Sequence, residues 1–513
     1  MKRILYCLTI AALTVPMLQA TGAEEAAAKP GIYDVHDYGA VGDGETLDTK
    51  AIQAAIDKSV DDGGGRVVLS GGTFLSGTIF LKSGTTLVLE DDAILLASTD
   101  IANYPAMEPA YRSYTENYSD KSLIYAEKQQ NISILGGGKI DGQGNAKSFR
   151  KANWKGRPFL LRFVECKNVT VKGITLVDSP FWTQHYLACD DVLIDGITVD
   201  SRRHWVADGL DIDSCHRVRV VNCDIRSMDD AIALKTTSPR ACKDVTVENC
   251  KLSSTGNAFK FGTESTGNFE NIVLTNCTLY DTKLAGVALM TVDGGVIDNV
   301  RISDITMRDV KCPIFLRLGN RARHYMSRRR GSTREVRELP EGVSLDERPG
   351  VGALRNVIIS DIKATGAGFE AGRLGKDGAC PIAGMEGHLI ENIILKNISI
   401  QYRGYETALK TQPKVPERDR RYPEQNMFGV LPAYGFYVRH AKNVRLESID
   451  LSFDRVEARP AIALDDVEDF YLKDATVDVE GKDLAPVWFE RVTSARIHSL
   501  TRRTAETAPQ PRE

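Results

Sequence analysis

A strand-like segment recurs through the middle of this chain at an almost constant interval. The copies begin at Asp191 (DVLIDGITVDS), Arg217 (RVRVVNCDIRSM), Asp244 (DVTVENCKLSST), Asn271 (NIVLTNCTLYDT) and Asn299 (NVRISDITMRDV), with nearly equal steps between them. Apolar residues alternate with polar ones in each copy, and Gly, Asn or Asp mark the turns, which is typical of strands. A unit of this size buries its apolar face only by stacking on its neighbours. The repeat therefore predicts an all-β solenoid.

The extent of the repeat favours one elongated domain. A chain of 513 residues would by length alone suggest several domains. Similar strand-like units nevertheless run from about residue 86 to residue 480. We therefore expect a single solenoid domain over residues 30–500. The segment 501–513 has little apolar content, so we expect it to be a disordered tail.

A short helix is predicted ahead of the repeats. Ile52, Ile56 and Val60 are spaced at i, i+4 and i+8. A helix over residues 49–60 would therefore carry one apolar stripe. Because the first coil of a solenoid has strand edges that can recruit other chains, we expect this helix to cap that end.

The N-terminus has the layout of a secretory signal. Lys2 and Arg3 precede an apolar run, and small residues near Ala20 or Ala23 offer a cleavage site. The run is too short and too near the start for a typical membrane span, and an uncleaved anchor is the alternative. We predict a signal peptide over residues 1–23, a secreted or periplasmic protein, and no membrane contact after cleavage. A net charge of −4 carries no signature of nucleic-acid binding.

The cysteines follow the repeat. Cys223, Cys250 and Cys277 are evenly spaced, at the same place in three consecutive copies. This spacing predicts a buried ladder of small apolar side chains. A disulfide is the alternative, because an exported chain meets an oxidising compartment. No histidine shares the spacing, so we expect no zinc site.

Three acids recur at close to the repeat interval. Asp229 and Asp230 follow Asp208 slightly less than one repeat later. Stacked strands lie roughly 4.8 Å apart, so these residues can become neighbours on successive coils. Three carboxylates on one face suggest acid/base chemistry, although an Asp pair can also simply cap a turn. Alternation through Ile232 and Leu234 would point Asp230 inward, unless the strand starts after it or a bulge redirects it.

Three stretches interrupt the repeats. They cover residues 103–120, 320–350 and 404–427. Insertions in a solenoid often lie on one face and line a binding site. A solvated loop is the alternative for each of them.

Several motifs together resemble one family. The opening DYGAVGDG and the later SGTIFLKS are similar to the start of pectin-degrading, right-handed parallel β-helix enzymes. SPFWTQH, ADGLDIDS, SMDDAIALK and GNAFKFGTES then follow in the order of the polygalacturonase family of glycoside hydrolases, family 28. The resemblance covers residues 35–310. It implies a right-handed parallel β-helix that hydrolyses pectic polysaccharides or their oligosaccharides without a metal or organic cofactor. The GTES ending looks more like the exo-acting members.

The resemblance also assigns roles to the acids. Glycoside hydrolysis needs a carboxylic acid at the leaving oxygen and a carboxylate that activates water or attacks directly. The family pattern places the proton donor at Asp229 and the water-activating acids at Asp208 and Asp230. Adjacent carboxylates raise one another's proton affinity, which keeps one protonated. Inverting enzymes hold the two groups roughly 6.5–9.5 Å apart, a spacing that we expect neighbouring coils to provide.

The chain departs from the family pattern at three places. The NTD triplet reads Val206-Ala207-Asp208, and the histidine of GHG is replaced by Asn257, which cannot titrate near neutral pH. The RIK motif, which binds a uronate carboxylate in the family, aligns with Ala288-Leu289-Met290. The loss of both cations leaves the identity of the sugar open.

Other cations could replace them. Lys235 and Lys260 alternate outward on one face, and Arg317 and Arg321 lie one coil further on. Each could bind a carboxylate or simply face solvent.

The remaining candidates are polar or aromatic. Glu264 could bind sugar hydroxyls or cap a turn. Trp182 and His185 lie on the coil before Asp208, where the tryptophan could stack on a sugar or pack in the core, and Tyr434 could form part of a wall. The predicted substrate-binding residues are Asn257, Lys235, Lys260, Glu264, Arg317 and His185.

Two other functions are compatible with the sequence. A polysaccharide lyase on the same kind of helix would use a basic side chain, often with calcium, to remove a proton beside a uronate carboxylate. A carbohydrate-binding or adhesive solenoid would keep the fold without catalysis, which the lost Asn, His, Arg and Lys positions would explain. We favour an exported, exo-acting, inverting hydrolase.

Overall fold

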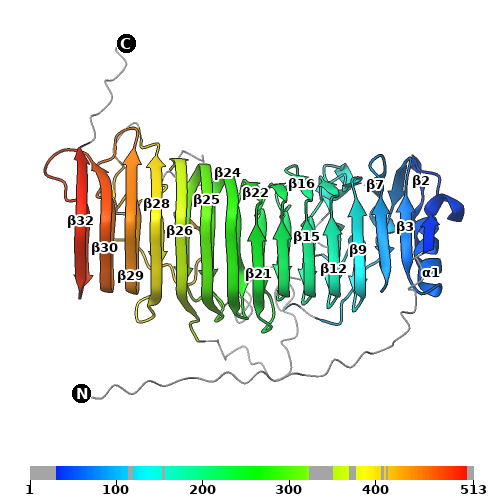
Figure 1. Ribbon diagram of the computed structural model, residues 1–513, viewed down its shortest axis with the longest axis horizontal. Coiled ribbons are helices and arrows are strands. Elements are labelled where there is room, and N and C mark those ends of the chain that lie inside the picture. Colours follow the sequence, from blue (N-terminus) through cyan, green and yellow to red (C-terminus); the bar gives the residue numbers. More distant parts are fainter. Residues whose placement is uncertain are drawn as a thin grey trace, which may run out of the picture.

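A computed structural model shows an elongated stack of parallel strands (Figure 1). It describes residues 31–111, 113, 119–152, 156–322, 350–368, 377–405, 409–411 and 414–504. In Figure 1 the strands follow one another from the blue end, where helix α1 (Thr49–Asp61) lies, to the red end at β32 (Ala495–Thr504). The predicted signal peptide over residues 1–23 lies outside the described residues.

Three parallel ladders run along the N-terminal half of the stack, and each successive coil adds one strand to each ladder. The first ladder contains β1 (Gly31–Asp34), β3 (Gly65–Leu69), β6 (Thr85–Leu89), β9 (Gln130–Gly136), β12 (Lys167–Lys172), β15 (Asp190–Asp195), β18 (His216–Val221) and β21 (Cys242–Glu248). The second contains β2 (Asp43–Leu47), β4 (Thr73–Ser76), β7 (Ile94–Ala97), β10 (Lys139–Asp141), β13 (Thr175–Val177), β16 (Thr198–Ser201), β19 (Asp224–Ser227) and β22 (Lys251–Ser254).

The third ladder carries the candidate site. It contains β5 (Ile79–Phe80), β8 (Ser122–Glu127), β11 (Phe159–Val164), β14 (Gln184–Leu187), β17 (Leu210–Asp213), β20 (Ile232–Thr236) and β23 (Phe259–Ser265). Strand β24 (Phe269–Thr291) pairs with the last member of all three ladders and so joins them. The stack continues through β25 (Val296–Leu318), β26 (Ala353–Ala367), β27 (Cys380–Ala383), β28 (Ile390–Tyr402), β29 (Phe436–Phe453), β30 (Ile462–Val479), β31 (Val487–Val492) and β32. The predicted parallel β-helix architecture is confirmed.

Equivalent residues of successive repeats lie side by side, as the period requires. Val192 pairs with Val218, which pairs with Val245, and all three are buried. At the following turn Asn222 and Asn249 have left-handed backbone angles, with φ of 60° and 55°, a conformation that asparagine tolerates better than most residues. The side-chain amide of Asn249 donates to Oδ1 of Asn222 at 2.6 Å. The recurring asparagine therefore serves each turn and links it to the next.

The cysteines next to these asparagines form the predicted ladder. Cys223, Cys250 and Cys277 are buried and unpaired, and the backbone N–H of Cys250 donates to Sγ of Cys277 at 3.4 Å. No disulfide joins any of the cysteines in the described part of the chain. The ladder prediction is confirmed, and the disulfide alternative is wrong for these residues.

Both ends of the stack can be compared with the predictions. Helix α1 buries Ile52 and Ile56 and packs against β1 and β3, so the predicted cap is confirmed. Strand β32 extends to Thr504, because it pairs with β30 along its whole length. The prediction of a disordered tail from residue 501 is therefore wrong for 501–504, and residues 505–513 lie outside the described residues.

Few helices interrupt the strands in the described part of the chain. Besides α1, it contains α2 (Lys147–Lys151) and the 3-10 turns η1 (Val35–Tyr38), η2 (Ile101–Asn103) and η6 (Gln425–Phe428). Within the described ranges, none of the helices has the length and apolarity needed to cross a bilayer.

Candidate active site

Three aspartates meet at the start of two neighbouring strands of the third ladder. Asp208 and Asp230 each lie two positions before a strand, and the first residues of these strands, Leu210 and Ile232, pair with each other. The backbone N–H of Asp230 donates to Oδ1 of Asp208 at 3.0 Å. One carboxylate oxygen from each of Asp208, Asp229 and Asp230 lies within 4.8 Å of the others. The structure thus brings together the three acids that the sequence singled out.

The turn before β20 decides where the acid pair points. Strand β20 begins at Ile232, after the pair, so strand alternation does not force Asp230 inward. The Ser227 hydroxyl donates to the carbonyl oxygen of Asp229 at 2.6 Å, and the Asp229 N–H donates to the Ala207 carbonyl at 3.1 Å. These bonds hold the backbone of the turn and therefore the directions of both side chains.

The acids are closer together than we expected. Their nearest oxygens lie within 4.8 Å, whereas inverting glycosidases commonly separate the two carboxyl groups by roughly 6.5–9.5 Å. The hydrogen bond from the Asp230 N–H to Oδ1 of Asp208 contributes to this closeness. The distance between nearest oxygens is a different quantity from the separation of the two carboxyl groups, so it gives no support for inversion.

Asp230 is the carboxylate that keeps its charge. Its Oδ1 accepts hydrogen bonds from the backbone N–H of Asn257 at 3.0 Å and from the Asn257 amide at 2.7 Å. Its Oδ2 accepts from Nζ of Lys260 at 2.7 Å. Burial works to raise the pKa of Asp230, but Lys260 and Asn257 outweigh it and hold the pKa below its usual value.

Asp229 has the opposite environment. Burial, followed by the charge of Asp230, raises the pKa of Asp229 to about 7. Its side chain is only partly buried, unlike those of Asp208 and Asp230. A Cβ on Gly256 would lie 2.9 Å from Oδ1 of both Asp229 and Asp230, so the absence of a side chain there makes room for the pair. Asp229 is thus a partly accessible acid that holds a proton near neutral pH.

A fourth carboxyl group, Asp211, was not among the predicted site residues. It lies on β17 and is fully buried. Burial raises its pKa to about 7, against the lowering influence of Lys235. Burial also raises the pKa of Asp208 well above its usual range, with the charges of Asp211 and Asp229 adding to the effect. Alternation along ADGLDIDS could have found Asp211, because Leu210 and Ile212 face the core and Asp211 therefore faces outward.

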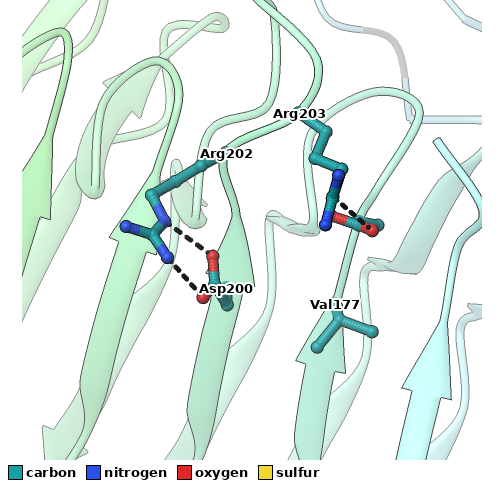
Figure 2. Close-up of a pocket in the computed structure, with 5 residues that line it drawn as sticks. Val177, Asp200, Arg202 and Arg203 are labelled. Carbon is teal, nitrogen blue, oxygen red and sulfur yellow. Dashed lines mark hydrogen bonds and ion pairs between the residues drawn. The ribbon is translucent and has the colours of Figure 1, made fainter. Parts of the chain in front are cut away.

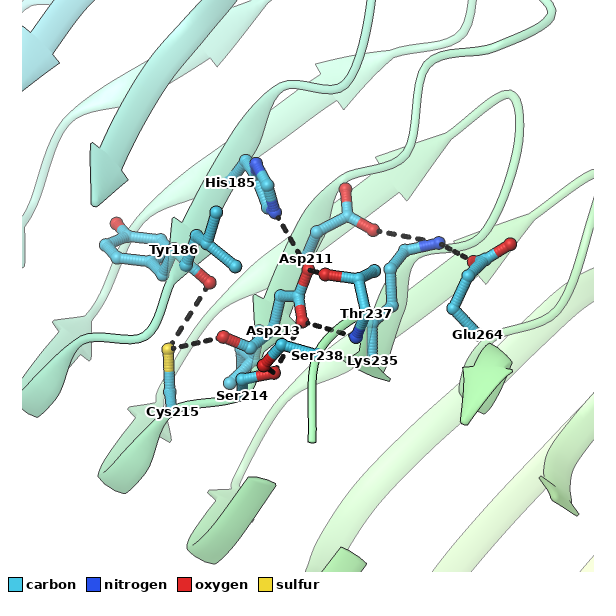
Figure 3. Close-up of polar contacts among 12 residues, drawn as sticks. His185, Tyr186, Asp211, Asp213, Ser214, Cys215, Lys235, Thr237, Ser238 and Glu264 are labelled. Carbon is cyan, nitrogen blue, oxygen red and sulfur yellow. Dashed lines mark hydrogen bonds and ion pairs between the residues drawn. The ribbon is translucent and has the colours of Figure 1, made fainter. Parts of the chain in front are cut away.

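Lys235 lies among these acids rather than in open solvent (Figure 3). Its Nζ is 3.6 Å from Asp211, 3.7 Å from Glu264 and 4.0 Å from Asp208. The register between β20 and β23 shifts after Leu234, which brings Glu264 to the level of Lys235. The lysine therefore offsets the charge of this acidic cluster.

Comparison with known proteins identifies the kind of site. Residues 68–321 match the profile of Glycosyl hydrolases family 28. The chain belongs to this family. It is 36% identical over 212 residues to a probable polygalacturonase of Vitis vinifera, a match that covers 39% of this chain and 43% of the relative. It is 40% identical over 125 residues to an exo-poly-alpha-D-galacturonosidase of Dickeya chrysanthemi, covering 23% and 20% respectively.

The matched part of this family 28 chain spans less than half the length of either relative. Over a longer range, the crystal structure of a hyperthermoactive exopolygalacturonase from Thermotoga maritima superposes with a TM-score of 0.60, at 20% identity. That match covers 83% of this chain and 93% of the other, and it supports the β-helix fold.

The residues that depart from the family 28 pattern lie on, or just before, strands next to the acids. Asn257, which replaces a histidine, donates its amide to Asp230 and accepts the Ala285 N–H at Oδ1, 3.1 Å away. Ala288 and Met290 are buried and bring no charge to the ladder. Two cations lie beside these positions in the ladder. Lys260 pairs with Ala288 across β23 and β24 and is already bound to Asp230, and Arg317 pairs with Met290 across β24 and β25.

His185 was predicted to contact the substrate, but it is fully buried. Its Nε2 lies 3.4 Å from Oδ2 of Asp213 (Figure 3). Its ring stacks on Phe159 with centroids 5.4 Å apart. Burial lowers its pKa. The aromatic side chain of Phe159 covers the imidazole. Direct contact with a sugar is therefore not what this structure provides.

The guanidinium of Arg317, which was predicted to bind substrate, is instead hydrogen-bonded to the protein. Its guanidinium donates to the carbonyl oxygens of Gly384 at 2.7 Å and Glu417 at 2.9 Å, and it lies 3.5 Å from Asp419. Its side chain is almost fully buried. Arg317 therefore anchors the segment around Glu417 to the sheet, in place of the predicted contact with a substrate carboxylate.

The segment that Arg317 anchors belongs to the third insertion, and it reaches the acids. Tyr422 accepts a hydrogen bond from Nζ of Lys260 at 3.1 Å. Glu424 is partly buried, and burial raises its pKa, with the Lys260 charge working against the shift and Asp230 adding to it. Both residues were missed from the sequence, because the insertion has no periodicity from which to place them. Its expected location beside the site is confirmed.

The two aromatic candidates have different roles. Trp182 lies with its ring 4.5 Å from Nζ of Lys235 and is mostly buried beside Phe181, which places it under the site. Tyr434 lies in the core, where its hydroxyl donates to the Asp478 carbonyl at 2.8 Å. The suggestion that Tyr434 forms a wall of the site is therefore wrong.

An open pocket of about 440 Å³ lies on the second ladder (Figure 2). Its lining residues are Val177, Asp178, Asp200, Arg202 and Arg203. Arg202 forms a two-pronged pair with Asp200, with both bonds at 2.7 Å, and Arg203 lies 3.1 Å from Asp178. The charged groups of this pocket thus satisfy one another, and none of the three catalytic candidates lines it.

Proposed function

We propose that this protein is an exported, exo-acting, inverting hydrolase of pectic polysaccharides or their galacturonate-containing oligosaccharides. The observation that carries the proposal is the contrast between Asp229 and Asp230. Neighbouring carboxyl groups have opposite pKa shifts, up to about 7 for Asp229 and down for Asp230. A protonated acid beside a charged carboxylate is the pair that glycoside hydrolysis requires.

The roles follow from these protonation states. Asp229 gives its proton to the glycosidic oxygen as the bond from that oxygen to the anomeric carbon breaks. A water molecule held by Asp230 and Asp208 attacks the anomeric carbon and passes its proton to the Asp230 carboxylate. The proton then returns to Asp229 through solvent, so each acid regains its starting state.

Inversion is supported by two carboxyl groups that can hold one water molecule together. Oxygens of Asp208 and Asp230 lie within 4.8 Å of each other, close enough for one water molecule to contact both. Oδ2 of Asp230 accepts a hydrogen bond from Lys260 and keeps a second lone pair, which can take a proton from that water. An inverting reaction needs such a water-activating carboxylate in addition to the proton donor.

Action at a chain end is supported by the third insertion and by the relatives. Tyr422 comes from the insertion and lies against Lys260, so the insertion closes part of the space beside the acids. The Dickeya chrysanthemi relative is named an exo-poly-alpha-D-galacturonosidase. A Zea mays relative, 28% identical over 229 residues, is named an exopolygalacturonase. Export is supported by the signal-like sequence of residues 1–23.

The proposal is tested with defined oligogalacturonides. Purified protein is incubated with them, and the first products are followed by mass spectrometry and by proton NMR of the anomeric signals. We expect single-residue release with inverted configuration, and we expect Asp229→Asn to lower kcat by about 10²- to 10⁴-fold. Full activity of Asp229→Asn would overturn the assignment of the acid. Retained configuration would overturn inversion, and products with a new double bond would indicate a lyase.

A further inference from the structure

Tyr422 lies between two cations at the edge of the site. Its hydroxyl accepts from Nζ of Lys260, which in turn binds Asp230, so the ring is two hydrogen bonds from a catalytic acid. On its other side, the guanidinium of Arg321 lies 4.9 Å from the ring centroid. The tyrosine is 42% exposed. An exposed aromatic ring held in place by cations offers an apolar surface on which a sugar ring can pack.

Most cations near the site are already bound to other groups of the protein. Lys260 is paired with Asp230 at 2.7 Å, and Lys235 lies within 4.0 Å of three carboxylates. Arg317 donates to backbone carbonyls and lies beside Asp419. Each of these three cations already has protein partners, which it would have to share or give up to bind an anionic ligand.

Arg321 is different. Nη1 of its guanidinium is buried and has no hydrogen-bond partner among the described residues. Its backbone is fixed, because its N–H donates to the Val292 carbonyl at 2.6 Å and the preceding residue, Asn320, donates to the Asp419 carbonyl at 2.8 Å. A buried donor without an acceptor is costly, and a guanidinium binds carboxylates with two parallel hydrogen bonds. The position therefore suits a ligand carboxylate.

We propose that Arg321 and Tyr422 form a subsite for a uronate residue of the substrate. The sugar ring packs on Tyr422, and its carboxylate accepts hydrogen bonds from the Arg321 guanidinium. The subsite rests on the proposed function, and it supplies the cation that Ala288 and Met290 do not. It is assembled from the turn after β25 and from the third insertion, so its location differs from the β24 strand that carries those two residues.

The turn that carries Arg321 and the insertion that carries Tyr422 are hydrogen-bonded to each other. The insertion accepts a hydrogen bond from Asn320 through Asp419, which lies close before Tyr422 in the chain. The same turn carries Arg321. One set of backbone contacts therefore sets the distance between the ring and the guanidinium.

The test compares trigalacturonate with its methyl ester, which has the same rings without the charges. Binding is measured by calorimetry in the Asp229→Asn background, and hydrolysis is measured in the otherwise unchanged chain. We expect Arg321→Ala to weaken binding of the free acid by about 10- to 100-fold and to change binding of the ester less than about threefold. Arg321→Lys, which keeps the charge but loses the planar fork, should have an intermediate effect. Tyr422→Ala should weaken binding of both ligands.

Arg308→Ala is the matched control, because Arg308 is an exposed arginine on β25 whose ion-pair contacts with Asp281 and Asp309 are both long, at 3.9 Å. It should change neither ligand's affinity. Equal losses for acid and ester in Arg321→Ala, or no loss for either, would overturn the subsite. If the protein binds the free acid through Arg321 but cleaves neither ligand, the subsite stands and the proposed hydrolysis fails.

Discussion

Lys260 places its ammonium nitrogen 2.7 Å from Oδ2 of Asp230 and 3.1 Å from the hydroxyl of Tyr422. This single lysine therefore joins a proposed catalytic acid on one coil to an insertion that lies far away in the sequence. It also separates the two neighbouring acids electrostatically, because it lowers the pKa of Asp230 while Asp229 stays high.

The pH profile should be set by the two adjacent acids. The acid Asp229 must be protonated, so activity should fall as pH rises through about 7. The carboxylate Asp230 must be charged, so activity should persist on the acidic side until pH drops below the usual range of an aspartate. We expect kcat to fall about tenfold per pH unit above the upper limit. Initial rates between pH 3 and 9 measure both limits, and a rate that keeps rising above pH 8 would contradict the assignment of Asp229.

Loss of Lys260 should move both limits upward. Without its ammonium, the pKa of Asp230 should rise because burial is no longer opposed, and the pKa of Asp229 should rise because Lys260 also lowers it. We expect Lys260→Met to shift the acidic and alkaline limits to higher pH. We also expect it to lower the free energy of unfolding by about 3 kcal/mol, since it leaves a buried carboxylate unpaired. The pH–rate profile and urea denaturation test this. Lys251→Met, which changes an exposed lysine on β22, should alter neither.

The positions of the Asp229 and Asp230 carboxyl groups should depend on the absence of a side chain at Gly256. A Cβ at this position would lie 2.9 Å from Oδ1 of both Asp229 and Asp230. We expect Gly256→Ala to displace these carboxyl groups and to lower kcat by about 10- to 100-fold, because small misplacements of catalytic groups are costly. Gly350→Ala is the control, since a Cβ there would meet nothing within 4 Å. An unchanged kcat for Gly256→Ala would show that the pair tolerates displacement.

Asp211 should make stability depend on pH. Its pKa is raised to about 7 in the folded protein, above the value near 3.9 of an unfolded aspartate. Its contribution to stability is therefore complete below about pH 4 and is lost as pH rises through about 7. The free energy of unfolding should therefore fall less between pH 5 and pH 8 in Asp211→Asn than in the wild type. We expect a difference of about 1 kcal/mol or more. Urea unfolding at both pH values measures it, with the exposed Asp281→Asn as control. Identical pH slopes in the wild type and Asp211→Asn would contradict the shift.

The sequence predicted those features that depend on the repeat. A nearly constant step determines which residues become neighbours, so the ladders, the cysteine stack and the meeting of Asp208 with Asp230 could be predicted. Alternation gave the outward direction of Lys235 and Lys260. It could not show which groups surround them, because Glu264 and Tyr422 reach these lysines only through the fold.

The insertions limited the prediction most. The segment that carries Tyr422 has no period, and its position depends on contacts with Arg317 on β25 and Arg439 on β29. A single sequence holds no signal for such pairings. The substrate contact predicted for Arg317 was wrong for the same reason, since the insertion takes up its hydrogen bonds.

Docking of the third insertion should depend on Glu417. Its carboxylate accepts hydrogen bonds from Arg439 and from Nε2 of His440, the latter at 3.1 Å, and its carbonyl accepts from Arg317. Removing the carboxylate leaves the buried Arg439 and His440 without this partner. We therefore expect Glu417→Ala to loosen the insertion and displace Tyr422.

The measurable result should be a rise in KM for oligogalacturonides by about 10-fold or more, with faster proteolytic cleavage between residues 404 and 427. Glu417→Gln, which keeps one acceptor oxygen, should lie between the wild type and Glu417→Ala. Glu391→Ala, a change of an exposed acid on β28, should leave KM and the cleavage rate unchanged. If Glu417→Ala is cleaved no faster and keeps its KM, the backbone contacts of Arg317 and Asn320 are sufficient to hold the insertion against the site.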